Sequence, residues 1–154
     1  MRALSILHPC ITIPDMEEAL VFFRDLLGFE VADQGGAHDP KQLGPLLGLD
    51  DPDVPVAIVT CPDGTEIELL EFRRPRGELS QESRPQDVGV RVVTIIVDEV
   101  DAMTERLAQA GYPPLGEIVP FVGPDRDLRA VHVPGPGGIP LTLGQWVEHP
   151  GTGE

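Results

Sequence analysis

Two nine-residue stretches of this sequence align without a gap, and they differ at a position that could do chemistry. They read PDGTEIELL at 62–70 and PGGIPLTLG at 136–144. The first carries Glu68 where the second carries Thr142. The alternation of apolar and polar residues around Glu68 is typical of a strand with one buried face. A carboxyl group among apolar side chains has a raised pKa, so Glu68 is a candidate general base.

Period-two alternation also predicts which residues would line a substrate site with Glu68. If Glu68 points to one face of its strand, Ile67 and Leu69 point to the other and pack beneath a helix. Trp146 adds one of the few aromatic side chains outside the predicted helices. No base is demonstrably adjacent to Cys10 in the sequence, so we do not expect a cysteine nucleophile. The same alternation predicts these further site-facing residues: Cys10, Thr12, Glu66, Leu70, Val90, Val92, Thr94, Pro140 and Thr142.

Composition and charge argue against several classes of protein. The chain has 154 residues, 41% of them hydrophobic, which suits one compact domain or two small modules that share a core. The formal net charge of −15 argues against a nucleic-acid partner, and no apolar run reaches membrane-spanning length. Two cysteines without metal-type spacing give no disulfide framework. The first residues lack the pattern of a secretory signal, so we expect a cytoplasmic protein.

The sequence repeats itself on either side of a linker rich in Pro, Ser and charge. Each half holds an apolar run, an Asp that could cap a helix, and about three turns of amphipathic helix closed by Gly. Glu18, three residues after the first Asp, could complete a capping box. The halves match at a constant offset of 83, which pairs Asp15, Ala19, Gly28 and Phe29 with Asp98, Ala102, Gly111 and Tyr112.

Each predicted helix is followed by three strand-like segments, so each half reads β-α-β-β-β. The segments lie at 30–34, 56–61 and 66–73, and at 117–122, 128–133 and 139–144. The predicted boundaries are a first module at 1–74, a linker at 75–87, a second module at 88–147 and a flexible tail at 148–154. Within the first module, 35–55 is predicted to be a long loop or lid, with room for a short helix around 41–48.

Four stretches together resemble the vicinal oxygen chelate superfamily, which includes glyoxalase I, extradiol dioxygenases and bleomycin-resistance proteins. They are HPCITIPDMEEALVFFRDLLGFEV, PDGTEIELLEFRRP, VVTIIVDEVDAMTERLAQAGY and VHVPGPGGIPLTL. The resemblance implies an α+β fold of two βαβββ modules in tandem. Their strands would curl into a cup-shaped mixed sheet with the helices outside. In the dioxygenase members the position of His132 holds a residue that faces the substrate, so the resemblance implies that His132 faces the cup.

Metal-dependent members of the superfamily hold a divalent ion at the base of the cup, on four ligands. The resemblance places two of them at His8 and Glu68. The third falls on Val92, or on Arg91 if the strict repeat offset is used, and the fourth falls on Thr142. A hard divalent cation takes about six donors, and two protein ligands rarely hold one against water. We therefore expect no metal and no other cofactor.

Three functions remain open at this point. The first is a metal-independent enzyme of isomerase, epimerase, cyclase or lyase type, with Glu68 as base and His8 or His132 returning the proton. The alternative is a small-molecule binding or self-resistance protein without catalysis. The third keeps a metal on His8, Glu68 and His132. All three imply a small-molecule ligand and no nucleic-acid or membrane partner, and the resemblance favours a homodimer.

Overall fold

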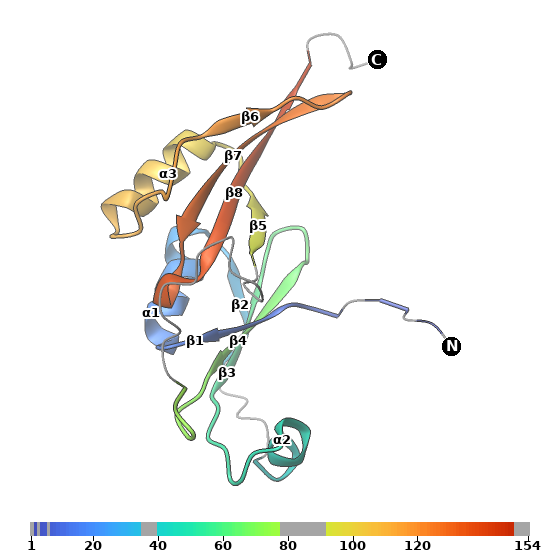
Figure 1. Cartoon of the computed structure of the whole chain (residues 1–154), viewed down its shortest axis with the longest axis vertical. Helices are drawn as coiled ribbons and strands as arrows, with labels where there is room; N and C mark the ends of the chain where they lie inside the picture. The colour runs from blue at the N-terminus through green and yellow to red at the C-terminus, as the bar shows by residue number, and fades with distance from the viewer. Residues whose placement is uncertain (1, 3, 6, 35–39, 78–91, 150–154) are drawn as a thin grey trace. The chain divides into compact units, whose positions relative to one another are not determined.

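The computed structural model describes residues 2, 4–5, 7–34, 40–77 and 92–149, and the chain divides into two compact units. These are Met1–Leu79 and Ser80–Glu154, and each runs β-α-β-β-β (Figure 1). The predicted α+β class and the two tandem modules are confirmed. Val90 and most of the predicted linker and tail lie outside the described residues. Within the described ranges, no helix is both long and apolar enough to cross a membrane.

The first unit is a four-stranded mixed sheet in the order β1-β4-β3-β2. β1 is parallel to β4, and the other neighbours are antiparallel. α2 coincides with the short helix that the sequence allowed around 41–48. The elements in chain order are β1 (Cys10–Ile13), α1 (Met16–Leu20) with the π-helical turn η1 (Val21–Leu26), β2 (Glu30–Gln34), α2 (Pro40–Leu47), β3 (Val56–Thr60) and β4 (Glu66–Glu71).

The second unit repeats this connectivity, with the strand order β5-β8-β7-β6 and β5 parallel to β8. β7 and β8 are longer than predicted and form an antiparallel pair over nine residues each. The elements are β5 (Val93–Ile96), α3 (Val100–Gln109), β6 (Val119–Phe121), β7 (Arg126–Pro134), the 3-10 turn η2 (Pro136–Gly138) and β8 (Pro140–Glu148).

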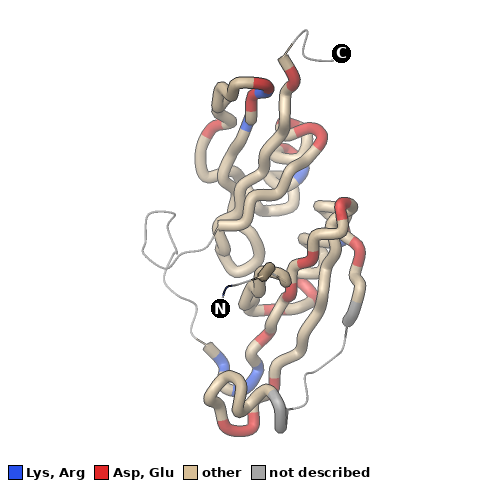
Figure 2. The backbone as a smooth tube through the Cα atoms, turned by 90° about the vertical axis from the view of Figure 1, so that its right-hand side faces the viewer, with Lys and Arg blue, Asp and Glu red and all other residues tan. Residues whose placement is uncertain are grey.

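In each unit a helix packs on one face of the sheet (Figure 1). Ile67 and Leu69 of β4 are buried on the helix side, as are Leu141 and Leu143 of β8. Burying one such side chain contributes about 1.5–3 kcal/mol, so this layer fixes which way each strand faces. Acidic residues far outnumber basic ones along both units (Figure 2).

The two helices begin differently from the prediction. Asp15 is the N-cap of α1, and its Oδ1 accepts a hydrogen bond from the Glu18 N–H at 2.8 Å. The N-cap of α3 is Glu99, and Asp98 Oδ1 accepts a hydrogen bond from the Glu99 N–H at 3.0 Å. Asp15 therefore corresponds to Glu99, and the predicted match with Asp98 is wrong by one residue.

The first helix contains one residue more than the second, and this accounts for the difference of one residue between the two N-caps. Gly28 and Gly111, which both have positive φ, lie 13 and 12 residues after the two N-caps (28 − 15 and 111 − 99). The first helix holds the additional residue in η1, where the Leu27 N–H bonds the Phe22 carbonyl five residues back at 3.1 Å. The offset between the halves is therefore 84 before the helix and 83 after it.

Candidate functional site in the first unit

The pairing of β1 with β4 brings three reactive side chains together. Cys10 and Glu68 are register partners, and the segment His8-Pro9-Cys10 leads into β1. Pro9 has no N–H to give, but its carbonyl accepts the backbone N–H of Glu68 at 3.0 Å. Residues two apart on an extended strand point to the same face, so His8 and Cys10 both reach the Glu68 side chain.

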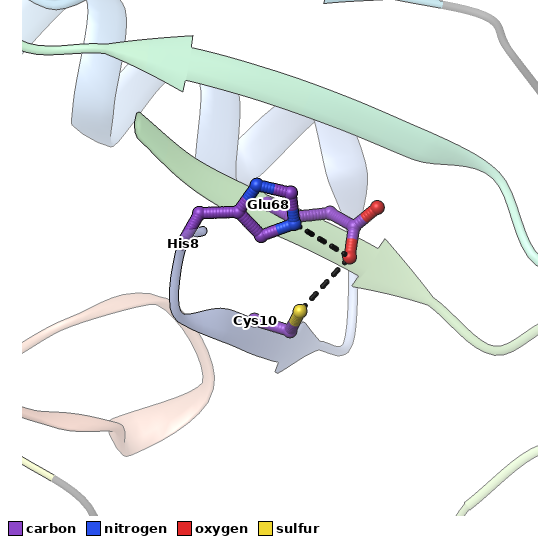
Figure 3. A group of neighbouring side chains, drawn as sticks. All are labelled: His8, Cys10 and Glu68. Carbon is purple, nitrogen blue, oxygen red and sulfur yellow. Dashed lines mark hydrogen bonds and ion pairs between the residues drawn. The ribbon is translucent and has the colours of Figure 1, made fainter. Parts of the chain in front are cut away.

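The Glu68 carboxylate is at the centre of this group, which we call the first-unit triad: His8, Cys10 and Glu68. Glu68 Oε2 accepts a hydrogen bond from Cys10 Sγ at 2.9 Å and lies 3.6 Å from His8 Nε2 (Figure 3). The side chains of His8 and Glu68 are only 15% and 12% exposed. Nδ1 of His8 is buried and has no hydrogen-bond partner among the described residues.

The thiol of Cys10 is a proton donor in this arrangement. Its pKa is raised from 9.0 to about 11, first by the hydrogen bond to Glu68, then by burial and then by the negative charge of that carboxylate. At neutral pH Cys10 is therefore protonated, which makes it a poor nucleophile. On the other side of Glu68, the register partner on β3 is Ile58, so the strand neighbour on that side is apolar.

The other predicted site residues of the first unit lie on the face of the triad. Thr12 is exposed, and Glu66 and Leu70 are half-buried, whereas Ile11 and Ile13 are buried on the helix side. This is the burial pattern that period-two alternation predicts. Their roles in binding a substrate stay predictions.

The second unit carries a different polar group at the corresponding place. His132 and Thr142 are register partners on β7 and β8, and His132 Nδ1 lies 2.8 Å from Thr142 Oγ1 in a hydrogen bond. Thr94 pairs with Thr142 from β5 and is exposed. Val92 and Trp146 are 39% and 40% exposed. Pro140 is buried, unlike the other predicted site residues that the structure describes.

The strand register shows which positions of the two units are equivalent. Cys10 pairs with Glu68 in the first unit as Thr94 pairs with Thr142 in the second. Thr142 is therefore the counterpart of Glu68, as the aligned stretches predict. Counting two residues back from Thr94, the counterpart of His8 is Val92.

The four-ligand metal set implied by the family resemblance does not fit this chain. Val92 offers no donor atom, and the Thr142 hydroxyl is engaged with His132. Neutral hydroxyls are also weaker ligands than the carboxylate that the set requires. The donors that remain from that set, His8 and Glu68, both belong to the first unit.

Two features of the triad are not predicted by the sequence. Alternation puts Cys10 on the same face as Glu68, but it predicts neither the hydrogen bond between them nor Ile58 as a neighbour of Glu68. The relevant signal was the pairing of β1 with β4, because a parallel register sets which side chains are adjacent. Alternation within one strand cannot supply that register.

Comparison with known proteins shows which family this chain is similar to. A family model described as the Glyoxalase/Bleomycin resistance protein/Dioxygenase superfamily matches residues 5–141. A 2-epi-5-epi-valiolone epimerase from Actinomyces sp is 30% identical over 152 residues, covering 92% of this chain and 79% of that protein. An ethylmalonyl-CoA/methylmalonyl-CoA epimerase from Cereibacter sphaeroides is 34% identical over 121 residues, covering 75% and 78%. These relatives support an enzyme of the epimerase type.

Solved structures show the same fold. A glyoxalase family protein from Bacillus cereus superposes with a TM-score of 0.81 at 24% identity, covering 96% of this chain and 97% of the other. A glyoxylase/bleomycin resistance protein/dioxygenase domain from Frankia sp. gives a TM-score of 0.63 at 20% identity, covering 97% and 96%. With the family model spanning most of its length, this chain belongs to the glyoxalase/bleomycin resistance protein/dioxygenase superfamily.

Proposed function

We propose that this chain is a metal-independent isomerase of the epimerase type, in which the Glu68 carboxylate removes a proton from a carbon next to a carbonyl group. The observation that carries the proposal is the first-unit triad. A largely buried carboxylate has a thiol donor at 2.9 Å and an imidazole at 3.6 Å. The two epimerase relatives support the reaction class.

The proposed reaction moves one proton off the substrate and one back. Glu68 takes the proton of the C–H bond, and the electron pair of that bond shifts to give an enolate with the charge on the carbonyl oxygen. The planar enolate can be protonated on either face, and return of a proton to the face opposite the one that lost it inverts the centre. We assign the returning proton to the His8 imidazole, whose Nε2 lies 3.6 Å from Glu68 Oε2 in the same unit, so the enolate turns its other face toward this pair before the proton returns.

The donor chemistry of the second unit supports the proposal of metal independence. Val92 and Thr142 stand where the family's metal set needs an imidazole and a carboxylate. The enolate oxygen would then be stabilised by hydrogen-bond donors of the first unit instead of a metal, and the proposal assigns this role to the His8 ring. This assignment predicts that chelators leave the activity intact.

The alternative, ligand binding without catalysis, is favoured by one observation in the second unit. Phe121, Leu128 and Trp146 are successive register partners across β6, β7 and β8, and Phe121 and Trp146 are 57% and 40% exposed. The Arg126 guanidinium lies 3.9 Å above the centre of the Trp146 ring. Such an apolar row, with an aromatic ring at each end, could hold an apolar or ring-shaped ligand.

Deuterium exchange separates the two functions. Chelator-treated protein is incubated in D₂O with 2-epi-5-epi-valiolone or with methylmalonyl-CoA, and exchange of the C–H next to the carbonyl is followed by NMR. The enzyme proposal predicts exchange with one probe above the uncatalysed rate, and its loss in Glu68→Gln. Binding of a probe without any exchange would favour the sequestering alternative, and absence of both would reject the proposed epimerase.

A further inference from the structure

The first-unit triad has the composition and spacing of a metal site that differs from the family's four-ligand set. His8, Cys10 and Glu68 each offer one ligand atom, and these atoms lie within 4.8 Å of one another. All three come from β1, its lead-in segment and β4, so the group is complete within one unit (Figure 3). Cys10 adds a sulfur donor at a position that lies outside the four-ligand set.

The distances in the triad are close to those of a tetrahedral zinc site. With Zn–N near 2.0 Å, Zn–O near 2.1 Å and Zn–S near 2.3 Å, tetrahedral angles separate N from O by about 3.4 Å and S from O by about 3.6 Å. The His8 Nε2 to Glu68 Oε2 distance is 3.6 Å. The Cys10 Sγ to Glu68 Oε2 distance of 2.9 Å must lengthen by about 0.7 Å, as expected when the hydrogen bond between them is replaced.

We propose that His8, Cys10 and Glu68 form an inhibitory binding site for a soft divalent cation of the Zn²⁺ type. Thiolate and imidazole select borderline and soft metals over Mg²⁺ or Ca²⁺, which take oxygen ligands in larger number. On binding, the Cys10 thiol loses its proton to solvent and its sulfur bonds the metal, while Glu68 gives up the electron pair with which it would accept a proton.

The inhibitory part of this inference rests on the proposed role of Glu68, whereas the binding part does not. A carboxylate that coordinates Zn²⁺ cannot at the same time act as a base. The cation would therefore oppose proton transfer, although it binds two residues that correspond to ligands in metal-dependent members of the superfamily. The site gives the protein a way to lose activity when free zinc rises and to regain it on chelation.

Cobalt spectroscopy tests the site without reference to activity. The chelator-treated full chain is titrated with Co²⁺, and the expected result is a near-ultraviolet thiolate-to-cobalt charge-transfer band that saturates at one ion per chain. Zn²⁺ should bleach the band because it stands above Co²⁺ in the Irving–Williams order, and Mg²⁺ should not. Cys10→Ser should abolish the band, and Cys61→Ser, which removes the other thiol, should keep it. A missing band, or one that survives in Cys10→Ser, overturns the site.

A second measurement uses the wild-type chain, so the site can be tested even if the Cys10→Ser variant fails to fold. In the wild-type chain, stoichiometric Zn²⁺ should protect Cys10 from alkylation while Cys61 continues to react, as read by peptide mass spectrometry. Equal labelling of Cys10 with and without Zn²⁺ also overturns the site. If Co²⁺ binds through Cys10 but Zn²⁺ leaves deuterium exchange unchanged, the inhibitory role is wrong. Failure of the proposed enzyme is seen separately, as absence of exchange in metal-free protein.

Discussion

Replacing Glu68 by Gln should remove most of the activity and little of the stability. The amide has the size of the carboxylate but cannot take a proton at neutral pH, so turnover should fall by ~10²–10⁴-fold, equivalent to about 2.7–5.5 kcal/mol of transition-state stabilisation. The amide oxygen can still accept the Cys10 thiol hydrogen bond now found at 2.9 Å. The free energy of unfolding should therefore change by only about 0–1 kcal/mol, and Tm by at most about 4 °C.

The matched control for this variant is Glu71→Gln on the same strand. Glu71 lies three residues along β4 and pairs with Arg73 at 3.1 Å. The Glu71→Gln variant makes the same change of charge outside the triad, and a partly exposed ion pair of this kind contributes about 0–1 kcal/mol. Deuterium exchange and thermal melts should be measured on both variants. If Glu68→Gln exchanges the substrate proton as fast as the wild type, or if Glu71→Gln is equally impaired, the assignment of Glu68 as base is refuted.

Three further predictions address the metal, the thiol and the helix caps. Chelator-treated protein should retain full exchange activity, and a loss that one divalent ion restores would contradict metal independence. Cys10 should alkylate about 100-fold more slowly at pH 7.5 than a thiol with the ordinary pKa of 9.0, because its pKa is about 11; the rate should climb toward that pH and should rise in Glu68→Gln. Asp15→Ala should cost about 1 kcal/mol of stability and Asp98→Ala clearly less, and equal losses in urea melts would contradict the corrected N-cap.

Most of the fold could be predicted because it depends on local patterns that repeat. Alternation identified the face of each strand, since burying Ile67 and Leu69 on one side leaves Glu68 on the other. The two aligned stretches share a glycine before the strand, and both of these residues, Gly64 and Gly138, have positive φ in the structure. These signals lie within a few residues of one another, so sequence alone carries them.

The triad could be predicted only in part because its geometry depends on pairing between segments 58 residues apart. The hydrogen bond from Cys10 to Glu68 exists because β1 and β4 are parallel neighbours in one particular register. A shift of one residue would turn Cys10 to the helix side and bring Ile11 beside the carboxylate. Neither segment encodes that choice alone, because it depends on burying the paired residues Ile11 and Leu69 on the same side of the sheet.

One additional residue in the first helix decides whether Arg91 or Val92 corresponds to His8. A constant offset of 83 would place Arg91 opposite His8, and a cation there would pair with acidic substrates. The additional residue in η1 means that this offset holds only after the helix. Before it, the N-cap at Glu99 and the pairing of Thr94 with Thr142 both require 84, which selects Val92. The second unit thus has neither an imidazole nor a carboxylate at the two ligand positions. We therefore assign the proposed proton transfer to the carboxylate, thiol and imidazole of the first unit.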